Sequence, residues 1–137
     1  MKLFDFKLIT PEETVYEGKI EEVILPTSTG EIAVLAGHEP LVTILSPGEI
    51  RIETGTLCLP MASLGGFAEI GPDFVRVLSD SAIATDKIDA ISAENAKKNA
   101  EAILEKATDD MEVAEASASL EKALLHIKIA NRKRKHH

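Results

Sequence analysis

The sequence predicts an α+β protein, in which an antiparallel β-sandwich of about ten strands is followed by an antiparallel two-helix hairpin. Short apolar runs, rich in β-branched residues and interrupted by Pro and Gly, recur as far as residue 85 with no helical interval between them. Directly after Ala84 the composition changes to Ala, Glu, Lys and Asn, which favour helix. This change predicts two domains, residues 1–85 and residues 86–137.

The first strand is expected at the amino terminus, where Phe4, Phe6 and Leu8 alternate with charged residues. A period of two places alternate side chains on opposite faces of a half-buried strand. Gly18 is expected to break the chain between the second strand and the third. The remaining strands are expected over residues 14–17, 19–25, 31–35, 41–45, 49–53, 56–63, 67–70 and 74–79.

The stretch from Val23 to Leu45 is the most informative part of the sandwich. Its three strands are nearly continuous in apolar residues, and loops at residues 26–30 and 36–40 separate them. Continuous apolarity is typical of strands that are covered on both faces. The stretch is therefore expected to form the interior of the sandwich.

The hairpin is predicted from alanine-rich stripes with helical spacing. Asp89 is a suitable N-cap for the first helix, and Asp109, within a short break at residues 108–110, is a suitable N-cap for the second. A connection this short makes the two helices antiparallel. Alanine buries little apolar surface, so we expect the helices to be held together weakly. Apolar stripe positions are expected at residues 93, 96, 100, 103 or 104 and 107, and at residues 113, 116 or 117, 120, 124 and 127.

Composition excludes several classes of protein. The chain has 137 residues and a net charge of −8, and its acidic excess lies entirely before residue 86. No apolar run approaches a membrane span, and the start has neither the features of a signal peptide nor those of an organelle presequence, so the mature protein is expected to begin near Met1. The single cysteine, Cys58, excludes an internal disulfide, fits a reducing compartment and, between two leucines, is expected in the core.

No set of residues in the sequence forms a catalytic or metal site. His38 has no second His, no Cys and no oriented carboxylate nearby, so neither catalysis nor a metal is expected, and no cofactor is expected. The alternative to the interpretation below is a β-sandwich that binds nucleic acid or protein with a basic tail. An acidic sandwich without Trp offers neither a basic face nor stacking residues, so a nucleic-acid partner is not expected.

Several motifs together resemble the epsilon subunit of the bacterial F-type ATP synthase, the ATP synthase epsilon chain family, whose mitochondrial counterpart is called delta. They are a Thr-Pro-Glu turn after the first strand, LPTSTGEIAVLAGHEPLVTIL, LGGFAEIGPDFVRVLSDSA and IDAISAENAKK. The resemblance covers nearly the whole chain, and the family's fold is a sandwich followed by a hairpin. The absence of a presequence suggests a bacterial member at the cytoplasmic face of the cell membrane, attached only through the complex, although a chloroplast-encoded member would have the same features.

The resemblance implies a non-catalytic rotor subunit. The sandwich would contact the gamma subunit and the ring of c subunits and couple proton flow to rotation, and the hairpin would extend to inhibit ATP hydrolysis by the alpha/beta hexamer. It also implies two sets of contact residues. Those near the c-ring would be Glu31, Gly37, His38, Glu39 and Pro40, and those facing acidic segments of beta would be Lys122, Lys128, Arg132 and Arg134.

One motif departs from the family pattern. Members that bind ATP in the hairpin resemble Ile/Leu-Asp-x-x-Arg-Ala, of which only Ile88, Asp89 and Ala93 match here. Ser92 occupies the position of the arginine, and Glu115 stands where such members place another one. Losing bidentate phosphate donors removes the charge that a nucleotide requires, so tight nucleotide binding is not expected.

Overall fold

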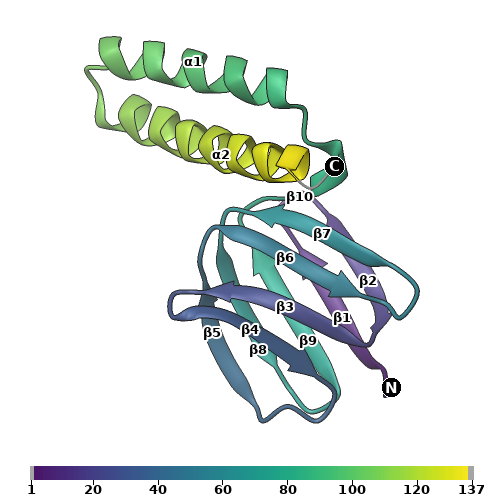
Figure 1. The fold of residues 1–137 in the computed structure, drawn as a ribbon. Helices are drawn as coiled ribbons and strands as arrows, with labels where there is room; N and C mark the ends of the chain where they lie inside the picture. The colour runs from purple at the N-terminus through teal and green to yellow at the C-terminus, as the bar shows by residue number, and fades with distance from the viewer. Residues whose placement is uncertain (1, 136–137) are drawn as a thin grey trace. The chain divides into compact units, whose positions relative to one another are not determined.

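The structure of the chain, a computed structural model, describes the backbone of residues 2–135 and the side chains of residues 2–131. It divides into two compact units, residues 1–86 and residues 87–137 (Figure 1). The first unit contains ten strands, as the sequence predicts. They are β1 (Phe4–Ile9), β2 (Thr14–Ile20), β3 (Glu22–Thr27), β4 (Gly30–Leu35), β5 (Leu41–Leu45), β6 (Gly48–Glu53), β7 (Cys58–Ser63), β8 (Gly66–Ile70), β9 (Phe74–Ser79) and β10 (Ala82–Ala84).

The strands form a β-sandwich with continuous pairing in the order β10-β7-β6-β3-β5-β8-β9-β1-β2, and β4 pairs with the other edge of β3. A single pair, Thr27 with Leu45, joins β3 to β5, and there the sheet folds into two layers (Figure 1). All pairings are antiparallel except that of β1 with β9. The layers enclose one core, whose fully buried large side chains include Phe6, Leu8, Ile20, Val23, Leu25, Val34, Ile50, Ile52, Ile70, Val75 and Val77.

Two local predictions were wrong. Gly18 does not break the chain, because it pairs with Phe6 inside β2 and the turn comes three residues later, at Glu21. Cys58 is exposed and not in the core. It lies opposite Glu53, whereas its neighbour Leu59 lies opposite the buried Ile52, so the thiol points away from the core. Partial burial, and then Glu53, raise the pKa of the Cys58 thiol.

The second unit is a hairpin of α1 (Ala90–Lys106) and α2 (Asp110–Lys135), preceded by the short 3-10 helix η1 (Thr85–Lys87). Asp89 caps α1 as predicted, since its Oδ1 accepts a hydrogen bond from the Ile91 amide at 3.0 Å. Asp109 caps α2 in the same way, with 2.7 Å from the Met111 amide to Oδ1. Neither of these described helices combines the length and the apolar composition that a membrane crossing requires.

The buried residues of the hairpin are mostly alanines spaced seven apart. On α1 they are Ala93 and Ala100, and on α2 they are Ala116, Ala123 and Ala130. A step of seven keeps side chains on the seam between two packed helices. We call these five residues the alanine seam. The stripes expected from the sequence were wrong at residues 96, 113 and 124, which are exposed, and of the two alternatives at residues 103 and 104 it is Leu104 that is partly buried.

Candidate interaction surfaces

The outer face of one sheet exposes a row of large apolar side chains. Ile44 on β5 pairs with Phe67 on β8, which pairs with Leu78 on β9, so the three side chains lie side by side. Ile44 is 73% exposed, Phe67 47% and Leu78 41%. Val42, two residues before Ile44 on the same face of β5, is 69% exposed. We call these four residues the apolar row.

The apolar row corrects the expectation that the stretch from Val23 to Leu45 is covered on both faces. In β5 only Leu45 is buried, while the outward side chains of the strand are apolar and exposed. Large contiguous apolar patches on a protein surface mark sites that contact a partner. An apolar run in a sequence cannot distinguish a face covered by the same chain from a face reserved for another one.

Charged side chains continue the same face beside the apolar row. Glu69, Arg76, Lys7 and Glu17 lie opposite one another across β8, β9, β1 and β2. The Arg76 guanidinium lies 3.5 Å from the Glu69 carboxylate and 4.8 Å from the centre of the Phe74 ring. An apolar centre bordered by exposed charges is the usual composition of a protein–protein interface.

The structure brings together four of the five residues expected near a c-ring. Gly37, His38, Glu39 and Pro40 form the loop between β4 and β5, in which Gly37 adopts a φ of +87° and its amide donates to the Pro72 carbonyl at 2.7 Å. His38 Nδ1 lies 2.7 Å from the Glu39 carbonyl oxygen. This loop also borders a shallow apolar hollow of about 420 Å³ lined by Pro40 and residues 41, 42, 69–72 and 74.

Glu31 lies away from that loop. It stands at the start of β4, opposite Pro26, while residues 37–40 follow the other end of the strand. Six residues of extended chain span roughly 20 Å, so Glu31 and the loop reach different ends of the sandwich. The exposed Glu31 carboxylate forms an ion pair with Arg51 at 3.3 Å. A partner that touches both would have to extend along the whole strand.

The basic residues of α2 do not gather on one described face. Lys122 and Lys128 are both exposed, but six residues separate them, so they point about 120° apart around the helix. His126 is partly buried, and burial, and then the charge of Lys122, lower the pKa of its imidazole. Arg132 and Arg134 lie on α2, but their side chains are outside the described residues.

The start of α1 shows what Ser92 does in place of an arginine. Its hydroxyl donates to Asp89 Oδ2 at 3.0 Å, while Asp89 Oδ1 accepts from the Ile91 amide. These two hydrogen bonds, that from Ser92 first, lower the pKa of the Asp89 carboxyl. Ile88 is partly exposed and Ala93 is buried in the alanine seam. Ser92 and Asp89 are therefore used by the cap of the helix.

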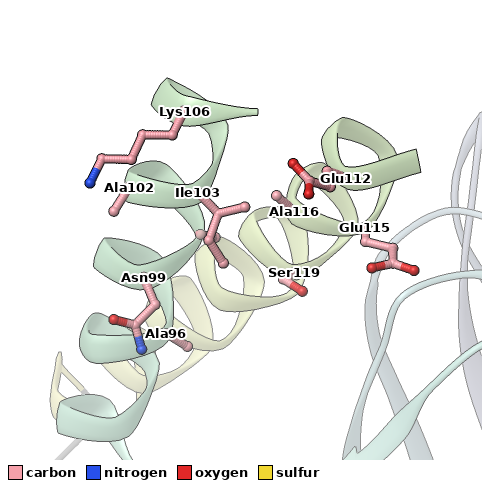
Figure 2. A pocket seen from close by; sticks show the side chains of 10 residues that line it. Ala96, Asn99, Ala102, Ile103, Lys106, Glu112, Glu115, Ala116 and Ser119 are labelled. Atoms are coloured by element: carbon pink, nitrogen blue, oxygen red, sulfur yellow. The ribbon is translucent and has the colours of Figure 1, made fainter. Parts of the chain in front are cut away.

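A groove of about 660 Å³ runs between the two helices near their connection (Figure 2). Its walls are mainly apolar, and Glu112 and Glu115 stand on its α2 side, with Lys106 at the end of α1. No lysine or arginine other than Lys106 lines it among the described residues. With two carboxylates and one ammonium, the charged side chains of the groove are net negative, which disfavours binding of a phosphate group. The lining residues are Ala96, Asn99, Ala100, Ala102, Ile103, Lys106, Glu112, Glu115, Ala116 and Ser119.

Within the described residues, no three His, Cys, Asp or Glu side chains lie close enough together to hold a metal ion. The candidate interaction surfaces of this chain are therefore the apolar row with its charged border, the loop at residues 37–40, Glu31, and the hairpin. All of them are suited to contacts with other macromolecules.

Comparison with known proteins agrees with this organisation. The family model for the β-sandwich domain of the ATP synthase delta/epsilon chain matches residues 3–85, and the model for its long α-helix domain matches residues 86–131. The ATP synthase epsilon chain of Dehalococcoides mccartyi is 40% identical over 94% of this chain and 93% of its own length. That of Laribacter hongkongensis is 39% identical over 93% of both chains.

Solved structures share the fold. A chain of the Euglena gracilis mitochondrial ATP synthase, described as OSCP/F1/c-ring, aligns with a TM-score of 0.68 and 24% identity over 87% of this chain and 76% of its own. A chain of the Tetrahymena thermophila mitochondrial ATP synthase central stalk and c-ring aligns with a TM-score of 0.56 and 12% identity over 65% of this chain and 72% of its own. On the family models and the curated relatives, this chain belongs to the ATP synthase delta/epsilon chain family.

Proposed function

We propose that this chain is a non-catalytic rotor subunit of an F-type ATP synthase that couples proton translocation to ATP synthesis. Its relatives at about 40% identity are epsilon chains over nearly their whole length. In the assembled enzyme the sandwich, residues 1–85, contacts the gamma subunit and the c-ring. The hairpin, residues 86–137, is regulatory and restrains ATP hydrolysis by the alpha/beta hexamer. The subunit is peripheral at the cytoplasmic face of a bacterial membrane and is held there by the complex alone.

The apolar row carries this proposal. Ile44, Phe67 and Leu78 expose large apolar side chains side by side, which is costly in water unless a partner covers them. A subunit that rotates with gamma needs a permanent contact, and permanent interfaces are the more apolar ones. We assign the apolar row to gamma, with Arg76 and Glu69 on its border.

The assignment of the c-ring contacts follows from the ends of the sandwich. The loop at residues 37–40 and Glu31 lie at different ends of β4, so one flat surface does not contact both equally. We therefore expect the contribution of Glu31 to ring binding to be separable from that of His38 and Glu39. Replacing each set in turn in a reconstituted complex measures this directly.

Binding of the full chain to purified gamma tests the proposal. Ile44→Glu or Phe67→Glu should weaken the affinity at least about a hundredfold, since buried aromatic and aliphatic anchors at the centre of an interface dominate its binding energy. Leu57→Glu is the matched control, because Leu57 is 61% exposed but lies in the turn between β6 and β7. Equal losses for Leu57→Glu and Ile44→Glu, or no loss for either, would refute the assignment of the apolar row.

A further inference from the structure

A continuous line of polar contacts runs across the outer face of the other sheet, from Glu31 to the residue that follows β10. The Arg51 guanidinium contacts both carboxylate oxygens of Glu31, with Nη2 to Oε1 and Nη1 to Oε2 each at 3.3 Å. Arg51 Nη1 also lies 3.9 Å from Glu49 Oε1. The Thr85 hydroxyl donates to the second oxygen of Glu49, Oε2, at 3.2 Å. We call Glu31, Arg51, Glu49 and Thr85 the polar relay.

Strand register explains why these four residues meet. Arg51 and Glu49 are two residues apart on β6 and so share a face. Glu49 pairs with Ala62 on β7, and Ala62 pairs with Ile83 on β10, which places Thr85 two residues beyond on that same face. Residues from β4, β6 and the start of η1 are thus aligned across the sheet, in which β3 lies between β4 and β6 and β7 lies between β6 and β10.

Burial increases along the relay. The side chains of Glu31 and Arg51 are 54% and 31% exposed, that of Glu49 is 12% exposed, and Thr85 as a residue is only 3% exposed. Hydrogen bonds to charged groups strengthen as water is excluded from them. The contacts nearest Thr85 therefore hold their geometry most firmly, and the Glu31 end remains open to a partner.

We propose that the polar relay controls how firmly the linker to the hairpin is anchored, so that a contact at Glu31 is transmitted to η1. Glu31 holds the planar guanidinium of Arg51 through one hydrogen bond and a second ion-pair contact, and Arg51 orients the Glu49 carboxylate. Glu49 then holds Thr85, the first residue of η1, on the sandwich. A cationic group of a partner that takes Glu31 away from Arg51 releases this orientation and loosens the linker.

The relay is a property of the chain alone and does not depend on the proposed function, which supplies only the identity of the partner at Glu31. Hydrogen–deuterium exchange on the isolated full chain therefore tests it. The readout is the exchange rate of the amides of η1 divided by that of the amides of β8, so that a change in global stability cancels. The variants are Thr85→Val, Arg51→Met, Arg51→Lys and Glu31→Gln, and the matched control is Lys19→Met, which breaks the exposed 3.2 Å pair of Lys19 with Asp5.

Thr85→Val and Arg51→Met should each raise the ratio about threefold to tenfold, which is the effect of losing one hydrogen bond of typical net strength. Arg51→Lys should give a ratio between those of wild type and Arg51→Met, because an ammonium keeps the charge but not the two-point contact. Glu31→Gln should raise the ratio about twofold although Glu31 does not touch η1, and Lys19→Met should not change it. Thr85→Val combined with Arg51→Met should exceed neither single variant, since both act through one contact.

Two results would overturn the proposal. If Thr85→Val raises the ratio while Arg51→Met and Glu31→Gln behave like Lys19→Met, the Thr85 bond is local and nothing is transmitted. If Thr85→Val leaves the ratio unchanged, the anchor itself does not exist. Cleavage by trypsin after the exposed Lys87, the last residue of η1, gives an independent measure that should rank the variants in the same order.

Discussion

Gly66 is a position where the backbone conformation and the space around the residue both require glycine. Its φ is +139°, and a β carbon there would collide with the Leu78 carbonyl group on the paired strand β9. Gly66→Ala must therefore both strain the backbone and separate β8 from β9. We expect it to lower the free energy of unfolding by about 2 to 4 kcal/mol, measured by urea denaturation.

Gly30→Ala is the control for backbone strain alone. Gly30 also has a positive φ, +122°, but nothing lies within 4 Å of a β carbon built on it. Gly30→Ala should lower the free energy of unfolding by no more than about 1 to 2 kcal/mol. If Gly66→Ala and Gly30→Ala lower the free energy of unfolding equally, the close approach of the Leu78 carbonyl does not contribute to the destabilisation by Gly66→Ala.

His126 makes the stability of the folded chain depend on pH. Burial, and then Lys122, lower the pKa of its imidazole in the folded state. As pH falls through the unfolded value of about 6.5, the unfolded chain takes up a proton that the folded chain does not, so stability decreases. The loss ends once pH is below the folded pKa. Thermal unfolding followed by helical circular dichroism should show a larger loss from pH 7.5 to pH 5.5 in wild type than in His126→Gln.

Lys122→Ala separates the two causes of the shift in the pKa of His126. Removing the ammonium one turn away should reduce the dependence on pH without abolishing it, because burial is the larger cause. If the stability of wild type and that of His126→Gln depend on pH in the same way, His126 is not the cause of the pH dependence.

The alanine seam determines how tightly the two helices of the hairpin pack against each other. Small side chains at Ala100 and Ala116 let two helices approach closely but bury little apolar surface. Ala100→Leu should force the helices apart and lower the melting temperature of the helical signal, at a cost of about 1 to 3 kcal/mol. Ala118→Leu, at an exposed position of α2, should leave the melting temperature nearly unchanged. Equal effects would show that the seam is not closely packed.

The hairpin should not bind ATP tightly. Ser92 is engaged by Asp89 in the N-cap, and the groove between the helices presents Glu112 and Glu115. We expect no binding at micromolar ATP by calorimetry. Ser92→Arg together with Glu115→Arg should strengthen any weak binding, since it restores two phosphate donors. Micromolar affinity in the wild-type chain would show that these positions do not decide nucleotide binding.

Sequence patterns predicted the features of the fold that depend on local chemistry. Nine of the ten strands, the N-cap at Asp89 and the change from strand to helix near residue 85 follow from alternation, turn residues and composition, whereas β10 was not among the expected ranges. The outward exposure of Ile44 and the exposure of Cys58 could not be predicted in this way. An apolar residue has the same pattern whether its own chain or a partner covers it.

The separation of the expected c-ring residues also required the structure. Glu31 and Gly37 are six residues apart in sequence, but that interval is the strand β4 itself, which places them at its opposite ends. The polar relay from Glu31 to Thr85 spans 54 positions of sequence and depends on strand register, which no local pattern specifies. Contacts of this kind decide which surface residues act together.

Inhibition of ATP hydrolysis should depend on the basic end of α2 and on ionic strength. The helix has 26 residues and is therefore about 39 Å long, enough to reach from a rotor base toward a catalytic hexamer. Exposed ion pairs contribute only about 0.2 to 1 kcal/mol each. Single substitutions should therefore change the rate of ATP hydrolysis only slightly, whereas the combined substitution should raise it clearly. The residues to be replaced together by Ala are Lys122, Lys128, Arg132 and Arg134.

The reconstituted complex carrying this fourfold variant should hydrolyse ATP at least about fivefold faster than wild type at low salt. The difference should shrink at about 0.5 M salt, where screening acts within a few ångströms. A variant with Lys97, Lys98 and Lys106 of α1 replaced by Ala loses charge from the same hairpin and should stay near wild type. If the fourfold variant hydrolyses ATP at the wild-type rate while deletion of residues 87–137 activates the enzyme, inhibition rests on apolar contacts of α2 such as those of the exposed Leu124, and not on charge.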